Sequence, residues 1–154
     1  MPSTVRVVYG QILTTSVVAA LSEDRNAGPA EILFSVALSM LVFWLAHVYA
    51  QAVALRLGRQ APLTWREVRT IMRQEWPIMQ AAVPALVVLG LGWVGVLSDR
   101  AAINLAIAVG VVALSGWGFV IGRRSGLSRL GTVGAVVLNG AFGLAIVALK
   151  VIVH

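Results

Sequence analysis

The sequence predicts an all-α membrane protein with five transmembrane helices. Of its 154 residues, 59% are apolar and only 12% are charged, and the mean hydropathy is +0.90. A typical soluble domain is about 45–50% apolar and about 25% charged. A water-soluble fold of this length would leave much apolar surface with no core to enter. We therefore do not expect a soluble enzyme or a nucleic-acid-binding protein, in spite of the net charge of +6.

Five apolar stretches are long enough to cross a hydrocarbon core about 30 Å thick, which takes about 20 helical residues. We expect spans at residues 4–21, 32–55, 77–97, 101–121 and 130–153, in a single domain covering 1–154. Turn-forming residues separate the spans, and Asp99 is expected to cap the fourth. Arg6 and the small residues Ala20 and Ser22 also suit a signal peptide, but we expect the first span to be retained.

The distribution of arginine and lysine predicts the orientation of the chain. Three basic residues, Arg25, Arg100 and Lys150, fall on one side of the predicted membrane. The other nine fall on the opposite side: Arg6, Arg56, Arg59, Arg66, Arg69, Arg73, Arg123, Arg124 and Arg129. Because cytoplasmic loops are enriched in basic residues, this bias predicts a multi-pass protein of the cell membrane with a cytoplasmic N-terminus and an external C-terminus. Its expected partners are the bilayer and anionic lipid headgroups.

Residues 63–76 are too polar to span and predict an amphipathic helix at the membrane interface. Thr64 and Glu67 have the spacing of a capping box, which marks a helix start. Apolar residues recur on one face, and Arg66, Arg69 and Arg73 line another face toward lipid headgroups. Pro77 is expected to begin the third span. The segment is either a lipid-anchoring linker or a helix that gates or docks a partner.

Polar groups inside the predicted spans are few, and none is acidic. All six carboxylates fall in connectors or at the interface, which weighs against a carboxylate-coupled pump. His47 is the only ionisable side chain well inside a span, and it is either a neutral hydrogen-bonded residue or a proton- or ligand-responsive one. With Ser39 and Gln51 it forms a polar stripe on the second span, next to Thr14 and Thr15 of the first. Asn139 is expected to bond across a helix interface.

Small residues predict close helix packing, either within one chain or across a dimer. Gly118 and Gly122 form a G-x-x-x-G pair, and Gly131 with Ala135 forms a small-xxx-small pair. The G-x-G-x-x-G run at residues 90–95 lies in an apolar span rather than after a strand, so it is not interpreted as a nucleotide site. No cysteine and no catalytic motif is present. We therefore expect no enzyme activity and no cofactor.

Two segments resemble the vacuolar iron transporter family, five-span exporters of iron and manganese. Val8-Tyr9-Gly10 followed by Ile12-Leu13-Thr14-Thr15-Ser16-Val17-Val18 is similar to the first-helix run of that family. Ala37-Leu38-Ser39-Met40 is similar to its second-helix segment. The resemblance implies five spans, this orientation, a cytoplasmic helical connector and a homodimer packed through glycine faces.

The metal-binding carboxylates of the family are missing from this chain. Its first-helix aspartate would fall at Gly10 or Gln11, and its second-helix glutamate near Trp44. Among the metal-contacting methionines, only Met40 is carried over by the resemblance. The resemblance therefore implies a fold and a dimer but no metal site. The Ala-, Val- and Arg-rich composition is also similar to that of small membrane proteins of high-GC bacteria.

Two functions follow from these observations. The first is a small transporter or channel-like protein that moves an ion or small solute past Thr14, Thr15, Ser39, His47 and Gln51. The second is a non-transporting assembly or regulatory subunit with a heterologous membrane partner. The missing span carboxylates and the arginine-bearing helix favour this second function.

Overall fold

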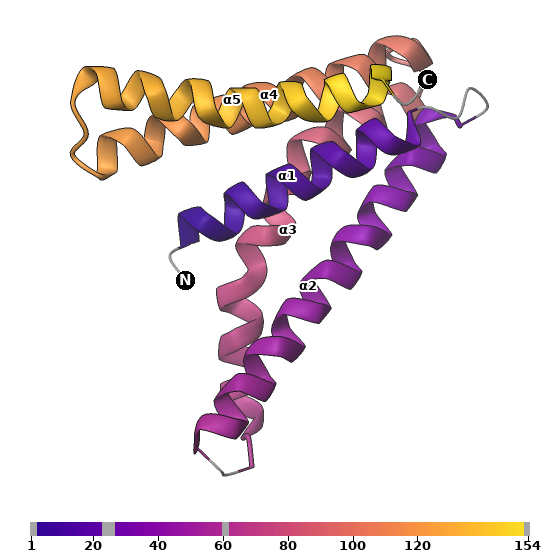
Figure 1. The fold of residues 1–154 in the computed structure, drawn as a ribbon. Coiled ribbons are helices and arrows are strands. Elements are labelled where there is room, and N and C mark those ends of the chain that lie inside the picture. Colours follow the sequence, from indigo (N-terminus) through magenta and orange to yellow (C-terminus); the bar gives the residue numbers. More distant parts are fainter. Residues whose placement is uncertain (1–2, 23–26, 60–61, 153–154) are drawn as a thin grey trace.

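The computed structural model describes residues 3–22, 27–59 and 62–152, and these form five α-helices and no strand (Figure 1). The helices are α1 (Ser3–Leu21), α2 (Pro29–Arg59), α3 (Trp65–Trp93), α4 (Asp99–Arg124) and α5 (Arg129–Ile152). The all-helical prediction is confirmed. Four of the helices, α1 to α4, are long and apolar enough to cross a membrane, while the apolar part of α5 that is described, Arg129–Ala145, is shorter. Arg25, the predicted span end at Val153 and the side chain of Lys150 lie outside what is described.

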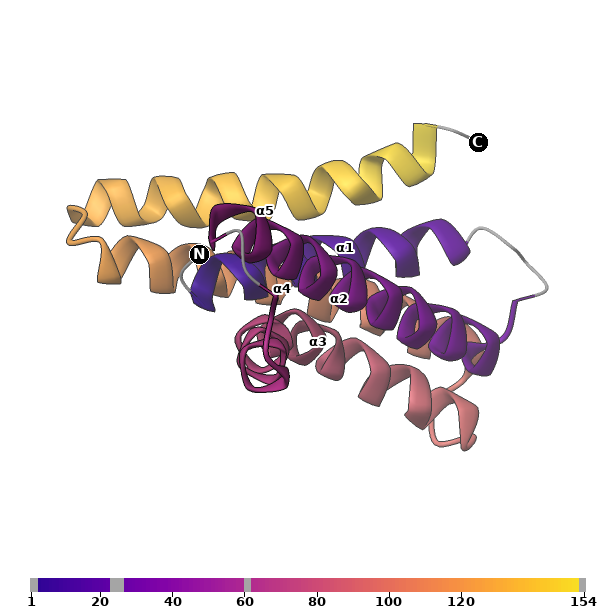
Figure 2. The same cartoon turned by 90° about the horizontal axis from the view of Figure 1, so that it is seen from below.

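The predicted boundary between an interfacial helix and the third span is wrong. Both segments belong to the continuous 29-residue helix α3, which contains Pro77 and Pro84 in its interior. Proline removes one backbone donor and crowds the preceding turn, which bends a helix without always ending it. Figure 2 shows the first turns of α3 nearly end-on and the remainder from the side, as a bent helix requires. The helix also ends at Trp93, before the predicted Leu97.

The first turn of α3 has the capping box that the sequence predicts. The Glu67 amide donates to the Thr64 hydroxyl, and the Glu67 carboxylate accepts from the Thr64 backbone amide at 2.9 Å. Arg59, at the end of α2, forms an ion pair with the same carboxylate. The hydrogen bonds from Thr64, reinforced by Arg59, hold the pKa of Glu67 below its ordinary value. One carboxylate therefore starts α3 and ties it to the end of α2.

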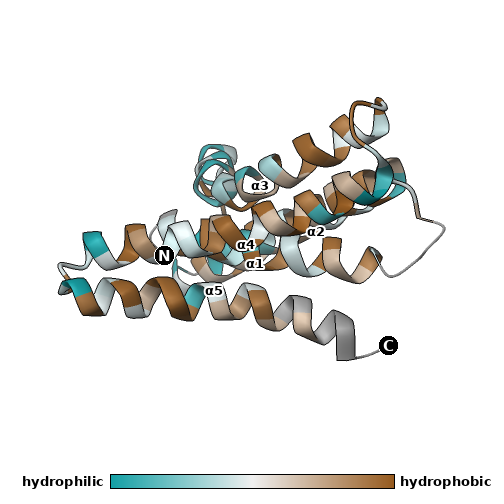
Figure 3. Ribbon diagram, turned by 90° about the horizontal axis from the view of Figure 1, so that it is seen from above, coloured by the Kyte–Doolittle hydropathy of each residue, from teal (hydrophilic) through white to brown (hydrophobic). Residues whose placement is uncertain are grey.

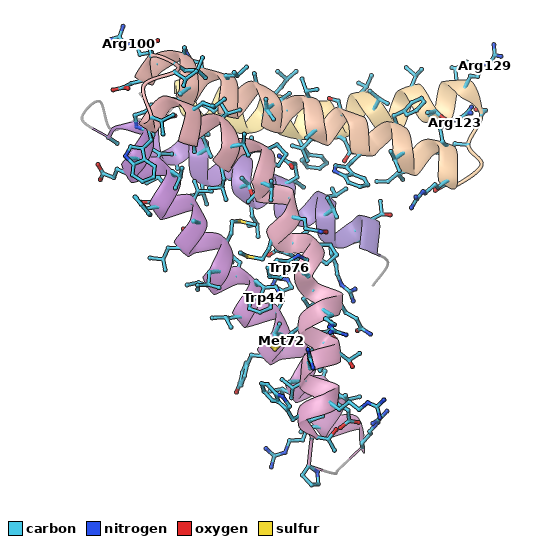
Figure 4. The ribbon with its side chains drawn as sticks, turned by 180° about the vertical axis from the view of Figure 1, so that it is seen from behind. Trp44, Met72, Trp76, Arg100, Arg123 and Arg129 are labelled. Atoms are coloured by element: carbon cyan, nitrogen blue, oxygen red, sulfur yellow. The ribbon has the colours of Figure 1, made fainter. Side chains whose placement is uncertain are left out.

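The apolar side of the first turns of α3 covers α2. Ile71 is buried there with Trp44 and Val48 of α2. The Trp44 indole donates to the Met72 carbonyl at 3.4 Å, and its ring meets Trp76 edge-on at 5.9 Å between centroids (Figure 4). The predicted apolar face is thus only partly buried: Ile71 packs against α2, while Trp76 stays half exposed. Trp44 fills a gap between the two helices.

The helices form two antiparallel pairs, α2 with α3 and α4 with α5, and α1 lies between them. Figure 1 shows the pairs close together near the starts of α2 and α4 and diverging toward the α2–α3 and α4–α5 turns. Among the helices as described, α5 contacts α4 and α1 alone. The main core is apolar and combines residues from α1 to α4, including Val18, Ile32, Met40, Ile78 and Leu89. The two pairs are therefore joined both directly, where α3 packs on α4, and through α1, which contacts all four other helices.

The two ends of the molecule are more polar than the helix bodies. Figure 3 shows hydrophilic residues at the α4–α5 turn and at the start of α3, with apolar residues along most of the helices. The turn between α3 and α4 depends on Gly95, whose φ of 77° is unfavourable for residues with a side chain. Asp99 is the first residue of α4 and Ser98 is its N-cap, with no side-chain cap bond, so the predicted cap at Asp99 is wrong.

Candidate functional site

A layer of polar side chains on α1 is buried in the centre of the molecule. Gln11, Thr14 and Thr15 are each 1% exposed or less. The hydroxyl groups of Thr14 and Thr15 bond to their own helix, donating to the Gly10 and Gln11 carbonyls at 2.8 Å. Such bonds satisfy a hydroxyl inside an apolar bundle without a partner from another helix. The three residues therefore place polar atoms in the interior without disrupting α1.

The polar layer faces two neighbouring helices. Thr14 Oγ1 lies 3.3 Å from the sulfur of Met40 on α2. Thr15 lies on the α4 side, where a Cβ added at Gly110 would collide with its hydroxyl group. Adjacent residues of a helix point about 100° apart, which accounts for the two directions. The two threonines, predicted to line one path, thus contact different helices.

Gln11 is the unsatisfied member of the layer. Its side-chain Nε2 is buried and has no hydrogen-bond partner among the described residues. A buried amide without a partner costs about 1–3 kcal/mol, so such groups call for an explanation. The Gln11 amide therefore has a donor without a partner in the described residues, one helical turn before Thr14 and Thr15 on α1.

A buried ion pair lies at the beginning of α1. Arg6 Nε and Glu75 Oε1 of α3 are 3.0 Å apart, with the side chains 12% and 2% exposed. The geometry of this contact is not that of a hydrogen bond, so the two groups interact as opposite charges. Arg6 Nη1 also donates to the Gln74 carbonyl at 2.8 Å. The sequence places Glu75 in an interfacial helix, and in the structure its side chain is buried between α1 and α3.

A close approach of α1 to α3 brings the ion pair and the polar layer together. A Cβ at Gly10 would lie 2.6 Å from the Ile78 carbonyl oxygen, which is closer than real Cβ atoms come. Only glycine allows this separation of the two backbones. Gly10 is one turn from both Arg6 and Thr14, so the close contact fixes the height of Glu75 against α1.

The remaining residues of the predicted path do not join this cluster. Ser39 is half-buried and Gln51 is exposed. His47 is half-buried, its Nδ1 is 2.9 Å from the Phe43 carbonyl of its own helix, and its ring lies 5.1 Å from that of Tyr9. Residues four apart drift around a helix by about 40° per step, so the members of the stripe have different surroundings.

The other residues that the sequence singles out lie outside the buried polar layer. The Asn139 amide donates to the Ala135 carbonyl of its own helix at 2.9 Å, so the expected bond across an interface is not seen.

Gly118 and Gly122 pack against Ala135 and Thr132 of α5 within the chain. A homodimer packed through these two glycines is therefore not available, because α5 already covers them. Gly131 lies next to Leu127 in the α4–α5 turn. Arg66, Arg69 and Arg73 are exposed, and their orientation toward lipid headgroups stays a prediction.

No group of three or more His, Asp or Glu side chains that could hold a metal occurs in the described ranges. Met40 contacts Thr14 instead of a carboxylate. Comparison with protein-family models, with curated proteins and with solved structures gave no match. The resemblance to vacuolar iron transporters accordingly stays a prediction.

Sequence reasoning missed the Arg6–Glu75 pair. A signal was present: a single arginine and a single glutamate, each near the predicted cytoplasmic end of an apolar span. The prediction of a helix break at Pro77 placed Glu75 in a surface helix, and this concealed the pairing. With α3 continuous, Glu75 lies one turn before Ile78, where α1 makes its closest approach.

Proposed function

We propose that the chain is a multi-pass protein of the cell membrane that moves an ion or a small polar solute past the buried layer on α1. The observation that carries this proposal is the buried, unpartnered amide of Gln11 beside Thr14 and Thr15. In a membrane, polar groups inside a bundle are expensive, and they commonly mark a substrate or ion pathway. This proposal moves the path from the stripe on α2 to α1.

The buried layer on α1 and the neighbouring Met40 offer three kinds of contact to such a solute. The Gln11 amide can donate, the threonine oxygen atoms can accept, and Met40 contributes a soft sulfur atom. The Arg6–Glu75 pair lies about one and a half turns away on α1, where it would meet a solute entering from the start of that helix. Because its charges offset each other, the pair adds polarity without a net charge that would trap an ion.

Transport is tested in liposomes that contain the purified protein, with a panel of small cations, anions and neutral polar solutes. Gln11→Leu removes the free amide at similar volume, and we expect it to lower the flux of the transported solute at least tenfold. Gln80→Leu makes the same chemical change at an exposed position of α3 and should leave the flux unchanged. Circular dichroism and unfolding curves check that both variants are folded.

Two outcomes would contradict the transport function. Absence of flux for the whole panel is the first. The second is a Gln11→Leu variant that transports as well as the original protein, which would mean that the layer has only a packing role. Either result favours the second function.

That second function is a non-transporting assembly or regulatory subunit. The observation in its favour is the exposed row of Arg66, Arg69 and Arg73 on the part of α3 that extends beyond the start of α1. Charge on a projecting helix suits an acidic partner protein or anionic headgroups. Crosslinking from cysteines introduced at these three positions should then capture one specific heterologous protein in native membranes. Recovery of nothing but copies of this chain would contradict this function.

A further inference from the structure

A cavity of about 360 Å³ lies at the turn between α4 and α5, away from the polar layer of α1. Its volume falls in the range of about 300–1,000 Å³ that is usual for small-molecule sites. Figure 4 shows the two labelled arginines of this turn at one end of the α4–α5 pair, opposite Arg100. The residues that line the cavity are Phe119, Arg123, Leu127, Arg129, Thr132, Val133 and Val136.

The turn that forms this cavity has a defined geometry. The Gly126 amide donates to the Arg123 carbonyl, and the Leu127 amide donates to the Gly122 carbonyl at 3.1 Å. These bonds, with a φ of 66° at Gly126, make a Schellman motif that ends α4. Ser128 then accepts a bond from the Gly131 amide at the start of α5. Arg123 and Arg129 therefore lie on either side of a hydrogen-bonded turn.

The two arginines supply positive charge that the described residues do not neutralise. The ion pairs found in ranges 3–22, 27–59 and 62–152 are Arg6–Glu75 and Arg59–Glu67, so neither Arg123 nor Arg129 has a carboxylate partner. The end of α4 and the start of α5 lie side by side, and their opposite dipole charges largely offset. The cavity is therefore positive because of its guanidinium groups, which bind phosphate with two parallel hydrogen bonds.

Apart from Thr132, the rest of the wall is apolar. Phe119 of α4 and Val133 and Val136 of α5 extend from the arginines toward the middle of the helices. Phe119 is 54% exposed and Val133 is 61% exposed, so no other described helix covers this side. The cavity is thus charged at the turn and apolar along the helices, just as a lipid is charged at its headgroup and apolar along its acyl chains.

We propose that this cavity binds one anionic phospholipid, with its phosphate held by Arg123 and Arg129 and an acyl chain along Phe119, Val133 and Val136. The occupant follows from charge complementarity, and from the position of the cavity at the predicted cytoplasmic face. Basic pockets between transmembrane helices on that face hold anionic headgroups. The site is separate from the polar layer of α1 and does not depend on the proposed transport function.

Lipid binding is measured by native mass spectrometry of the purified protein titrated with phosphatidylglycerol, with phosphatidylcholine of the same chains, or with glycerol phosphate. We expect one tightly retained phosphatidylglycerol per chain. The Arg123→Gln/Arg129→Gln variant should weaken its binding at least tenfold. Arg56→Gln/Arg100→Gln removes the same charge from two exposed positions outside the cavity and should change this binding less than twofold. Val133→Trp keeps both arginines but fills the cavity, and it should also displace the lipid.

Four results would overturn the proposal. Equal losses in the two double variants would mean attraction by diffuse charge. Equal retention of phosphatidylcholine would mean binding through the acyl chain alone. Comparable binding of glycerol phosphate would mean a site for a free anion. Undiminished binding to Val133→Trp would place the lipid outside the cavity. Circular dichroism spectra and melting temperatures close to those of the original protein are required of each variant before its binding is compared.

Discussion

The Arg6–Glu75 pair shows how one contact can fix two helices. Removing two charges from water costs several kcal/mol per ion, and a partner within contact distance largely compensates for that cost. Glu75 is 2% exposed, so its carboxylate has little access to water as a replacement for Arg6. The pair therefore specifies how α1 is placed against α3, more than it adds net stability.

Breaking this pair from one side is expected to be strongly destabilising. Glu75→Gln leaves the Arg6 charge buried without its counter-charge, and the free energy of unfolding should fall by about 3–5 kcal/mol. Unfolding in detergent, followed by circular dichroism, measures the change.

The control replaces both partners. Arg6→Met/Glu75→Leu removes both charges and should recover most of the loss, because well-packed apolar residues often replace a buried pair without cost. A loss below about 1 kcal/mol for Glu75→Gln alone would mean that the pair is effectively solvated.

At the scale of the elements, the α4–α5 pair depends on a seam of small residues. A Cβ at Gly118 would lie 2.5 Å from the Ala135 carbonyl oxygen, and one at Gly122 would lie 2.8 Å from Thr132 Cα. These neighbours are backbone atoms and cannot rotate away. The two helix axes are therefore held at a separation that only glycine permits.

A matched pair of alanine substitutions on α4 tests this seam. Gly118→Ala should lower the free energy of unfolding by about 1–3 kcal/mol, because the added methyl group forces α5 outward. A Cβ at Gly116 meets nothing within 4 Å, so Gly116→Ala should be neutral or stabilise α4 by up to about 1 kcal/mol. Thermal unfolding compares the variants. Equal changes in stability for Gly118→Ala and Gly116→Ala would mean that close packing at Gly118 does not hold α4 against α5.

Helix α3 shows how a strong local signal can mislead. Pro77 suits a first helical turn, and the composition changes at that point, so the sequence favours two separate helices. In the structure the turns before Pro77 pack on α2 through Ile71 and Trp44. Packing on both sides of a proline retains a helix that would otherwise end there.

At the scale of the whole molecule, the helices alternate in direction, so that the two ends differ in charge. The α2–α3 and α4–α5 turns and the start of α1 lie toward one side, and the ends of α1 and α3 lie toward the other (Figure 1). Eight of the nine arginines of the predicted cytoplasmic side are exposed, and the ninth, Arg6, is packed against Glu75. This separation of charge is what the positive-inside rule requires of the proposed orientation.

Single cysteines test the orientation without background, because the chain has none of its own. Ser98 and Ser125 are both exposed and lie in turns at opposite ends of α4. A membrane-impermeant maleimide should label Ser98→Cys in intact cells, and it should label Ser125→Cys only after the membrane is opened. Labelling of Ser125→Cys in intact cells would contradict the predicted orientation.

Much of the fold was predictable because its signals are local. The lengths of the apolar stretches predicted where the helices lie, and the Thr64–Glu67 spacing predicted where α3 begins. The candidate site was only partly predictable. Thr14 and Thr15 were named as members of a path, but their neighbours Met40 and Gly110 lie on two other helices, far away in the chain. Periodicity on one helix cannot say which other helix lies against it.

The sequence by itself therefore determined the helical class and the separation of charge between the two ends. These properties follow from composition and from contacts within a few residues. Tertiary structure alone decided that Glu75 is buried against Arg6, that Gln11 Nε2 has no partner among the described residues and that α5 covers Gly118. Each of these depends on the distance between two helices, and that distance is set by glycines and side-chain volumes far apart in the chain.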